Sequence, residues 1–510
     1  MMQVYKLDGN SIDIISCPPE DLRKGDYVLV EDAAAEATLV AQVINMGYAD
    51  IPGILEDLLR ETGVESLAGR DFDTLQIRSF IDMIRDAKVF KCKIRRSIVN
   101  GKLSDDISWS PSRSTSRVLK IGGRELLKLI GIDGKRSITL GMLKNGTNIA
   151  TPLSAIDGRL NIITGKKGTG KSHLSKLLVL SLASKGGMCV VFDVNGEYVN
   201  LGYSNDGEVS PDNRISVLSP GENFKVTLKY MGLGTLLSIV SAVLDLPANS
   251  AWEIRRIWSR LEMKNALTLK SFGEAISSVS NGYVRDALLR RYESLLGSGF
   301  FTDDIKEATT LEEWLEKIKD GGAVIINLRR LPASLRRIIV EFMLSKLCYL
   351  LEAWLIRAIF LFAEEAHLYL RETYWEDIVT RMRHLGIFPT FVTNQPDSIS
   401  NSIYRQADNI FLFNFTNDND LSTVSKATMV DAQTIETIAK ELPPHHCLVL
   451  GKVVHDFPLI MKVKELKTKA MGETRLFFQE EKNKGKDASD EDFLDRWIAK
   501  KAETPIYHKK

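Results

Sequence analysis

Residues 160–185 read LNIITGKKGTGKSHLSKLLVLSLASK, and this stretch decides the fold. It opens with 160–163, a short and mostly apolar run that predicts a buried strand, and it closes with leucines at helical spacing. Between the two lies a complete GxxxxGK[ST] phosphate-loop motif, formed by Gly165, Lys166, Lys167, Gly168, Thr169, Gly170, Lys171 and Ser172. A strand, a glycine-rich loop and a helix in this order predict a nucleoside triphosphate site.

The residue types of this motif match the chemistry of phosphate binding. Glycines let the backbone curl so that its N–H groups face the phosphates, and the helix N-terminus adds the positive end of its dipole. We expect Lys171 to reach the β- and γ-phosphates and Ser172 to hold Mg²⁺. The motif, together with His173 directly after it, is therefore predicted to bind ATP with Mg²⁺ as the metal ion.

The composition is that of an ordinary globular protein with more than one domain. At 510 residues with 44% hydrophobic content, the chain can form two or three domains with cores of their own. The formal net charge is +1, so any contact with nucleic acid must come from local patches. The basic stretch 91–136 is one such patch, and a solvated face explains it as well as a DNA-binding surface does.

Cysteine usage and hydropathy exclude several classes of protein. The five cysteines are far apart and form no CxxC pair, which argues against a disulfide framework and a zinc site. His445-His446-Cys447 lacks a second ligand pair at fixed spacing and is not expected to bind metal. The start MMQVYKLDGN is not a signal peptide, and no apolar run approaches membrane-spanning length. We therefore expect a cytoplasmic protein with no membrane contact.

Two patterns of strands divide the chain. Short strand-like runs separated by Gly, Pro and Asp predict a small N-terminal β-barrel, with a helix over 51–88. After residue 160, strands alternate with helices, which predicts an α/β fold with a parallel sheet and a helical insertion. Strands are expected at 3–7, 12–17, 27–31, 40–46, 89–98 and 117–121, and then at 188–194, 323–328, 358–363, 388–393, 409–415 and 446–453.

These patterns predict five parts of the chain. They are an N-terminal β-barrel domain at 1–150, a first ATPase core part at 151–227, a helical insertion at 228–320, a second core part at 321–465 and a C-terminal arm at 466–510. The arm is charged and contains a short candidate helix at 493–501.

Two glutamates follow a predicted core strand and complete a hydrolytic site with the phosphate loop. The strand 358–363 is followed directly by Glu364 and Glu365, at the strand end where α/β sheets place their ligands. We expect Glu364 on the metal side and Glu365 to polarise the attacking water. An acid-rich helix N-terminus is the alternative, since the helix dipole favours acids there, but the phosphate loop favours catalysis.

Two further polar residues are predicted at the same edge of the sheet. Gln395 follows the strand 388–393 and is a candidate sensor of the γ-phosphate, with a turn-capping amide as the alternative. Glu197 follows the strand 188–194, and its role stays open between a carboxylate that supports the site and a helix cap.

Arg159 and Arg383 are candidates for stabilising charge on the phosphates. Arg383 lies just before the strand that leads to Gln395, and Arg159 directly precedes the strand that leads to the phosphate loop. That strand spans about 16 Å at roughly 3.3 Å per residue, and the phosphates lie at its far end. Because a side chain cannot cover this distance, Arg159 is predicted to act on the nucleotide of a neighbouring copy, as an arginine finger. An ordinary surface arginine is the alternative.

These residues together resemble the motifs of one family. Over most of its length the chain is similar to the HerA group of the HerA/FtsK hexameric translocases. The family motifs recur in order at Asp193 with 196–198, at 364–367, at 383–386 and at 393–395, with Arg159 before the core strand. Two positions depart from the family pattern, since Asn195 stands where histidine is usual and His384 where lysine is common.

The resemblance implies a RecA-like phosphate-loop ATPase core behind the small β-barrel. It also implies a homohexamer that uses ATP to pull double-stranded DNA through its channel. A partner protein is expected with it, either a NurA-like nuclease in DNA-end processing or an effector of bacterial antiphage defence. Candidate contacts to the DNA backbone are Arg329 and Arg330, and also Arg255 and Arg256, with a solvated loop or helix face as the alternative.

Two other functions remain open. An ATPase ring that scaffolds or gates a defence effector, without processive translocation, would share every motif above. A coupling ATPase of conjugation or secretion is disfavoured, because the sequence has no membrane-spanning run.

Overall fold

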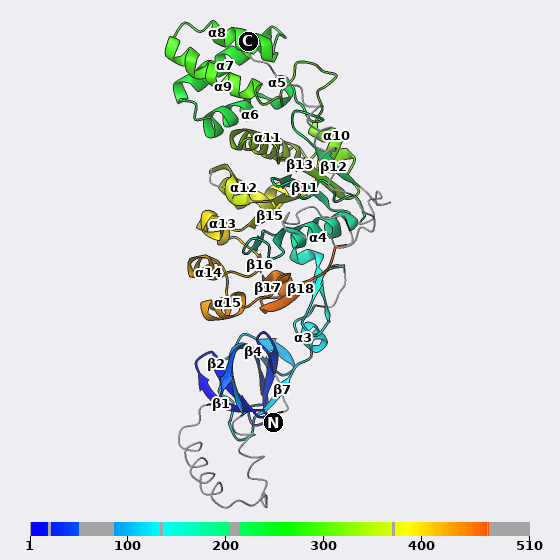
Figure 1. Cartoon of the computed structure of the whole chain (residues 1–510), viewed down its shortest axis with the longest axis vertical. Helices are drawn as coiled ribbons and strands as arrows, with labels where there is room; N and C mark the ends of the chain where they lie inside the picture. Colours follow the sequence, from blue (N-terminus) through cyan, green and yellow to red (C-terminus); the bar gives the residue numbers. More distant parts are fainter. Residues whose placement is uncertain are drawn as a thin grey trace, which may run out of the picture. The chain divides into compact units, whose positions relative to one another are not determined.

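The structure is a computed structural model that describes residues 2–18, 22–49, 86–132, 136–204, 214–369, 373–466 and 468. These residues form two β-sheets and the helices around them (Figure 1). The predicted helix over 51–88 lies outside the described residues except at its end, where a strand begins at Lys88. The predicted helix at 493–501 also lies outside them.

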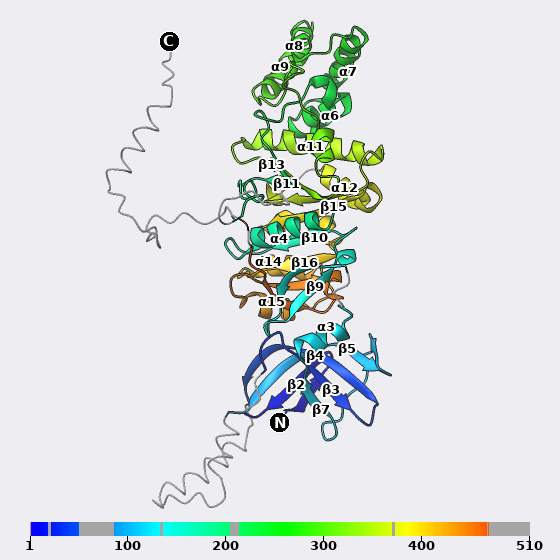
Figure 2. The same cartoon turned by 90° about the vertical axis from the view of Figure 1, so that its right-hand side faces the viewer.

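The N-terminal segment forms a seven-stranded antiparallel sheet (Figure 2). Its strands are hydrogen-bonded in the order β1-β2-β5-β4-β3-β7, and β6 pairs with β5. Alternate residues of β2, such as Ile12 and Ile14, are buried in a core that also contains Val28 and Phe90. The strands predicted here are confirmed, and β6 is added to them. Their bounds are β1 Met2–Asp8, β2 Ser11–Ser16, β3 Tyr27–Asp32, β4 Ala37–Tyr48, β5 Lys88–Val99, β6 Lys102–Ser104 and β7 Arg117–Lys120.

The phosphate-loop segment belongs to an eleven-stranded sheet. Its order is β12-β13-β11-β14-β15-β10-β16-β17-β18-β8-β9. Neighbours from β12 to β16 are parallel, as predicted, and neighbours beyond β16 are antiparallel. The bounds are β8 Ser137–Met142, β9 Asn148–Pro152, β10 Asn161–Thr164, β11 Met188–Asp193, β12 Ile215–Leu218, β13 Gly322–Asn327, β14 Ile359–Ala363, β15 Ile387–Thr393, β16 Asn409–Leu412, β17 His446–Gly451 and β18 Leu459–Val463.

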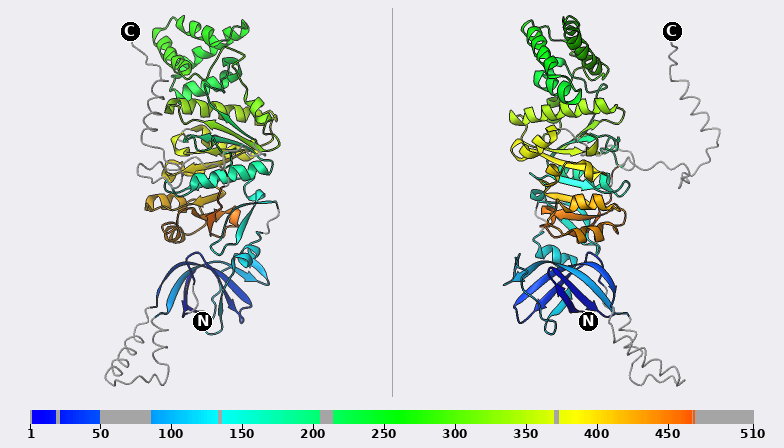
Figure 3. Two further views of the ribbon diagram at one scale, coloured as in Figure 1. Left: turned by 45° about the vertical axis from the view of Figure 1, so that its right-hand side comes forward. Right: turned by 90° about the vertical axis from the view of Figure 1, so that its left-hand side faces the viewer.

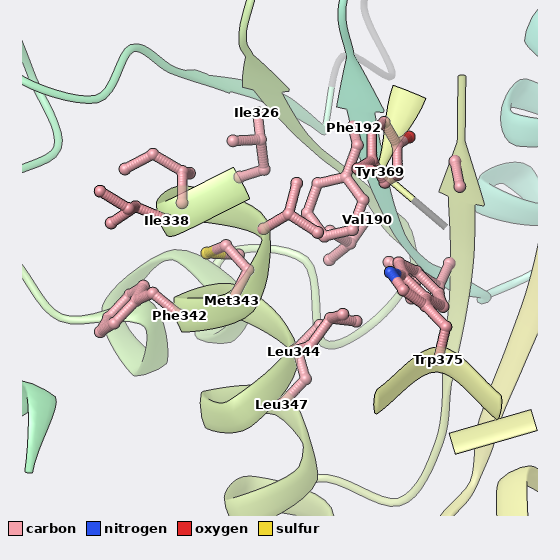
Figure 4. Close-up of a cluster of buried hydrophobic side chains, with 14 of the residues drawn as sticks. Val190, Phe192, Ile326, Ile338, Phe342, Met343, Leu344, Leu347, Tyr369 and Trp375 are labelled. Carbon is pink, nitrogen blue, oxygen red and sulfur yellow. The ribbon is translucent and has the colours of Figure 1, made fainter. Parts of the chain in front are cut away.

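Helices cover both faces of the parallel strands, because alternate residues of each strand point to opposite faces. Val190 and Phe192 of β11 pack against α11 (Ala333–Glu352), and Figure 4 shows side chains of this helix facing them. Cys189 and Val191, which alternate with them, belong to the core on the other face, which α4 (Lys171–Ser184) covers. The strand and the helix on either side of the phosphate loop are therefore both fixed by buried apolar contacts.

Most of the other helices lie between β12 and β13 or connect the later strands; the first group is drawn in green in Figure 3. The helices between β12 and β13 are α5 Leu228–Met231, α6 Leu233–Ser238, α7 Ala248–Met263, α8 Leu269–Ser277, α9 Gly282–Leu296 and α10 Leu311–Glu316. The remaining ones are α3 Gly123–Leu129, α12 Thr373–Leu385, α13 Asn401–Tyr404, α14 Asp418–Ser425 and α15 Ala432–Ala439. No helix within the described ranges has both the length and the apolar character needed to cross a membrane.

Four strands of the larger sheet differ from the sequence-based expectation: β8, β9, β12 and β18. β8 and the first half of β9 lie within the range 1–150 that was expected to form the barrel domain, but β8 pairs with β18 of the larger sheet. The change from one sheet to the other therefore falls between β7 and β8. β12 and β18 were not predicted. β12 has only four residues at the sheet edge, and three of them are only partly buried, so its strand signal is weak.

A polar cluster joins the two sheets. Tyr27 and Gln42, from the small sheet, both donate to the Pro458 carbonyl at 2.8 Å. Arg95 donates to the Gln42 amide oxygen at 2.9 Å and to Asp431, which caps α15, at 3.0 Å. Every partner in this cluster is satisfied, so the contact costs little desolvation and specifies one arrangement of these groups.

Replacing Gly141 with alanine should destabilise the protein through the β8–β18 pairing. A Cβ at this position would lie 2.2 Å from the Lys462 carbonyl oxygen and 2.6 Å from the Met461 side chain. Overpacking of this kind costs about 1–3 kcal/mol, which urea and thermal unfolding would measure. Gly47→Ala in β4 is the matched control, because its Cβ would meet nothing within 4 Å. Equal stability of the two variants would contradict the placement of β8 beside β18.

Candidate nucleotide site

Two side chains of the phosphate loop donate hydrogen bonds to the backbone of the same loop. It connects β10, which ends at Thr164, to α4, which begins at Lys171, so the predicted order of strand, loop and helix is confirmed. The Thr169 hydroxyl donates to the Lys166 carbonyl at 2.7 Å, and the Lys171 ammonium donates to the same carbonyl at 3.0 Å. Gly170 has a φ of 115°, a left-handed conformation that any side chain would strain.

Lys171 is buried next to carboxylates. Burial lowers the pKa of its ammonium group, and the charges of Glu365, Glu364 and Glu197 oppose that shift. These carboxylates follow β14 and β11, whereas the loop follows β10. The structure thus brings the phosphate loop and the predicted glutamate pair together at the carboxyl edge of the parallel strands.

Glu364 is a buried carboxyl group that accepts a hydrogen bond from the Tyr198 hydroxyl. Its exposed fraction is 3%. Burial raises the pKa of Glu364 to about 8; the bond from Tyr198 opposes this rise, and the charges of Glu197, Glu365 and Asp193 add to it. A carboxyl group that is costly to ionise by itself gains most from a cation beside it. The sequence showed no sign of this tyrosine partner.

The turn after β11 is shaped by Asp193. Its carboxylate accepts the backbone N–H groups of Gly196, Glu197 and Tyr198 at distances of 2.8 to 3.0 Å. The Glu197 carboxylate accepts a hydrogen bond from Lys176 of α4 at 3.2 Å. Of the two roles left open for Glu197, the observed contact is therefore that of a supporting carboxylate and not of a helix cap.

Glu365 lies on a strained turn at the same edge. Its φ of 47° is left-handed, a conformation that non-glycine residues adopt at a cost and that concentrates at functional sites. Asn195 donates to its Oε1 at 3.4 Å, and Nδ1 of His367 lies 3.4 Å from its Oε2. The side chain is 23% exposed. It is therefore partly exposed, unlike the buried Glu364, although its Oε2 is buried and has no hydrogen-bond partner among the residues that the structure describes.

The end of β15 brings more polar atoms to this edge. The Thr393 hydroxyl lies 3.2 Å from Nδ1 of His367 and accepts the Gln395 N–H at 3.0 Å. Gln395 is exposed, at the position predicted for a γ-phosphate sensor. The side-chain oxygen of Asn394 is buried and has no hydrogen-bond partner among the residues that the structure describes. Sequence reasoning did not single out Asn394.

These groups fit a magnesium ion that is held mainly by nucleotide phosphates. Mg²⁺ prefers oxygen ligands and usually takes only one or two from the protein. Ser172 is half-buried at the start of α4, Glu364 supplies a carboxylate, and Asn394 supplies the orphaned oxygen. Within the described ranges no group of three or more His, Cys, Asp or Glu side chains could hold a metal ion alone. The donor set therefore suits Mg²⁺ with ATP.

Two histidines, His173 and His445, lie beside the phosphate loop. Nε2 of His173 lies 2.8 Å from the Lys464 carbonyl, and burial lowers the pKa of this imidazole. The ring of His445 lies edge-on to it, with ring centroids 5.3 Å apart. A Cβ on Gly170 would come within 3.1 Å of the His445 ring. The contact between His445 and the loop was missed, because only the folded chain brings them together.

Arg159 and Arg383 lie together at the opposite edge of the sheet. Arg159 donates to the Asp408 carboxylate at 3.0 Å, and Arg383 donates to both of its oxygens at 3.0 and 3.2 Å. Asp408 precedes β16, which runs parallel to β10 with Asn161 opposite Asn409. Arg159 and the phosphate loop are therefore at opposite ends of β10, as expected. The shared partner Asp408 was not predicted.

The candidate DNA contacts lie on the surface. Arg329 and Arg330 are exposed after β13 and border a hollow of about 300 Å³ next to Gly196. This places the first pair at the carboxyl edge, close to the turn that Asp193 shapes. Arg255 and Arg256 are exposed on α7, where Arg256 forms an ion pair with Glu253 at 2.6 Å.

The comparisons with known proteins agree with this geometry. Residues 138–347 match the family model described as the central domain of the helicase HerA. A DNA double-strand break repair helicase HerA from Saccharolobus solfataricus is 21% identical over 489 residues, which cover 88% of this chain and 93% of that protein.

Two solved structures resemble the fold of this chain. The conjugative coupling protein TrwB has a TM-score of 0.50 at 13% identity and covers 69% of this chain and 94% of its own. VirB4 of Thermoanaerobacter pseudethanolicus has a TM-score of 0.50 at 13% identity and covers 65% and 96%. At this identity the similarity shows the fold alone, which is the predicted RecA-like phosphate-loop ATPase fold.

The raised pKa of Glu364 predicts a pH-dependent stability when metal and nucleotide are absent. Between an ordinary glutamate pKa near 4.5 and about 8, the folded chain binds more protons at this site than the unfolded chain. Stability should therefore fall as the pH rises through this range. Glu364→Gln removes the titration, so its Tm relative to wild type should rise between about pH 5.5 and pH 8 in EDTA.

Glu365→Gln is the matched control for this series, because the Glu365 side chain is more exposed. Its Tm relative to wild type should change less over the same range. A Glu364→Gln difference that does not depend on pH would contradict the assignment of a costly buried carboxylate.

Proposed function

We propose that this chain is an ATP hydrolase that moves double-stranded DNA. The observation that carries the proposal is the meeting of Lys171 with the Glu364–Glu365 pair at one edge of a parallel sheet. A phosphate loop alone supports nucleotide binding, and carboxylates beside it support hydrolysis. The HerA-type central domain supports DNA as the partner, since the similar protein from Saccharolobus solfataricus is named a DNA double-strand break repair helicase.

Each residue of the carboxyl edge has one role in this proposal. Residues 165–173 bind the ATP. Their backbone N–H groups and the Lys171 ammonium contact its phosphates. Ser172 and Glu364 would hold Mg²⁺, which would supply positive charge against the phosphates. Glu365 orients and polarises the attacking water, for which its partly exposed side chain is suited. Gln395 contacts the γ-phosphate.

Arg159 and Arg383 act on the ATP of a second copy. They lie at the amino edge of the sheet, about 16 Å from the phosphates of their own chain at roughly 3.3 Å per residue. In a closed ring, each interface joins the carboxyl edge of one copy to the amino edge of the next. Every phosphate loop is then next to the arginines of a neighbouring copy. The proposal takes this ring to be a homohexamer, as in the translocases that the chain resembles.

The proposal also includes a partner protein and a division of the chain. A motor that moves DNA leaves its strands intact, so we expect a nuclease or a defence effector to work with it. An ATPase ring that gates such an effector without translocation is the runner-up. We also propose the division of the chain into a barrel domain, two core parts, a helical insertion and a C-terminal arm. The first boundary is moved to lie between β7 and β8.

Glu365→Gln should bind ATP and Mg²⁺ but hydrolyse little ATP, because an amide cannot polarise water as a carboxylate does. We expect kcat to fall by about 10²- to 10⁴-fold, with a Kd for a fluorescent ATP analogue close to wild type. Lys171→Ala is the comparison and should weaken binding itself. Near wild-type turnover by Glu365→Gln would show that another residue supplies the catalytic carboxylate.

Arg329 and Arg330 should contact DNA phosphates. A track that grips duplex DNA without reading bases depends on charge, so binding should fall steeply with salt and show little sequence preference. Replacing both arginines with glutamate should bring the ratio of ATPase rates with and without long duplex DNA close to one. Replacing both with lysine is the matched control and should retain stimulation. DNA stimulation that survives the glutamate exchange would rule out this track.

A further inference from the structure

Asp408 occupies a fixed place between the two arginines. It directly precedes β16, and its backbone N–H donates to the Leu160 carbonyl at 2.9 Å. In return, the Leu160 N–H donates to Oδ2 of Asp408 at 3.0 Å. The Asp408 carboxylate is therefore held at the amino end of β10 by the same pairing that holds the strand. Its side chain is only 8% exposed.

Both arginines converge on this one carboxylate. Nη1 of Arg159 lies 3.0 Å from Oδ1 of Asp408. Nη2 of Arg383, from the last turn of α12, lies 3.0 Å from Oδ1 and 3.2 Å from Oδ2. The arginine side chains remain 34% and 58% exposed, respectively. A buried anion thus holds two cations whose other ends face the surface.

The charges of this group suit an anionic ligand. Two guanidinium groups so close together repel each other unless an anion lies between them, and Asp408 compensates one of the two charges. Each guanidinium has five N–H donors, and Asp408 accepts from one nitrogen of each. The surplus positive charge is directed outward, and planar guanidinium groups bind phosphate oxygens well.

The surroundings of the group are hollow and basic. Arg159 lines a hollow of about 340 Å³, which Lys452, His455 and Asp456 also line. Asp408 lines a second one of about 330 Å³, together with Arg405, Lys426 and Lys452. Lys452 forms an ion pair with Asp456 at 2.7 Å, so Asp456 is compensated by a residue other than the two arginines.

We propose that Asp408 is a positioning residue that holds Arg159 and Arg383 as one unit, presented to the triphosphate bound by a second copy of this chain. The inference rests on the proposed function, because it takes the arginines to act on a neighbouring site. It adds that the two arginines act together and that their geometry depends on an anion between them. A plain strand cap would need only an acceptor for the Leu160 N–H, and a neutral asparagine supplies that as well.

Asp408→Asn separates these two roles. The asparagine carbonyl can still accept the Leu160 N–H, but the charge that orders the arginines is lost. We expect kcat for ATP to fall by about 10²-fold, the size of effect seen when catalytic groups are displaced by about 1 Å. The KM for ATP and the assembly size should stay close to wild type, since the phosphate loop is untouched. Asp456→Asn is the matched control and should retain activity.

Mixed assemblies test on which side of the site Asp408 acts. Asp408→Asn protomers have an intact phosphate loop, and Lys171→Ala protomers have an intact arginine group. Mixing the two variants should restore hydrolysis at the interfaces that combine intact parts. A wild-type kcat for Asp408→Asn would overturn the inference. A second contradicting result is that verified mixed assemblies of Asp408→Asn and Lys171→Ala stay inactive, whereas those of Arg159→Ala and Lys171→Ala recover activity.

The last pair separates this inference from the proposed function. If verified mixed assemblies of Arg159→Ala and Lys171→Ala stay inactive, the arginine does not act in a neighbouring site and the composite site itself is contradicted. If they recover while Asp408→Asn alone is as active as wild type, the composite site stands and the positioning role of Asp408 falls.

Discussion

The rest of the structure depends on the parallel register of β10 between β15 and β16. Asn161 lies opposite Thr390 on one side and Asn409 on the other, so three strands run in the same direction at the centre of the sheet. Their carboxyl ends carry the phosphate loop and the turn after Thr393, and their amino ends carry Arg159, Arg383 and Asp408. A strand length separates the two sets of groups. No side chain crosses that length, so in the proposed function a complete site combines two copies of the chain.

The ionisable groups at the carboxyl edge differ in how much burial disfavours their charged forms. Burial raises the pKa of Glu364 and lowers the pKa of Lys171, so each group is costly to charge in the buried edge. ATP phosphates and a divalent cation together would supply the opposite charges that both groups lack. Glu365 differs because its turn holds it partly exposed, where it can meet water. Two adjacent glutamates thus have different environments and suit different roles.

Sequence reasoning found the parts of the site that follow directly from strand order. The phosphate loop, the Glu364–Glu365 pair and the opposite placement of Arg159 all depend on which residues begin or end a strand, and parallel pairing then brings like ends together. Local patterns could not show contacts made by residues far apart in the chain. The bond between Tyr198 and Glu364, the Asp408 partner of both arginines and the His445 contact with the loop are of this kind. The strands β8 and β9 were misplaced for the same reason, since only their pairing with β18 assigns them to the larger sheet.

In the proposed function, the chain hydrolyses ATP in order to move duplex DNA. The most direct test is the steady-state ATPase rate of the full chain with and without long double-stranded DNA, with Glu365→Gln as the blank for contaminating activity. The account predicts a strong increase that rises with duplex length, because a motor that stays on its track turns over repeatedly on longer DNA. An ATPase rate that belongs to this site but is unchanged by duplex DNA of any length would contradict the account and favour a ring that gates an effector.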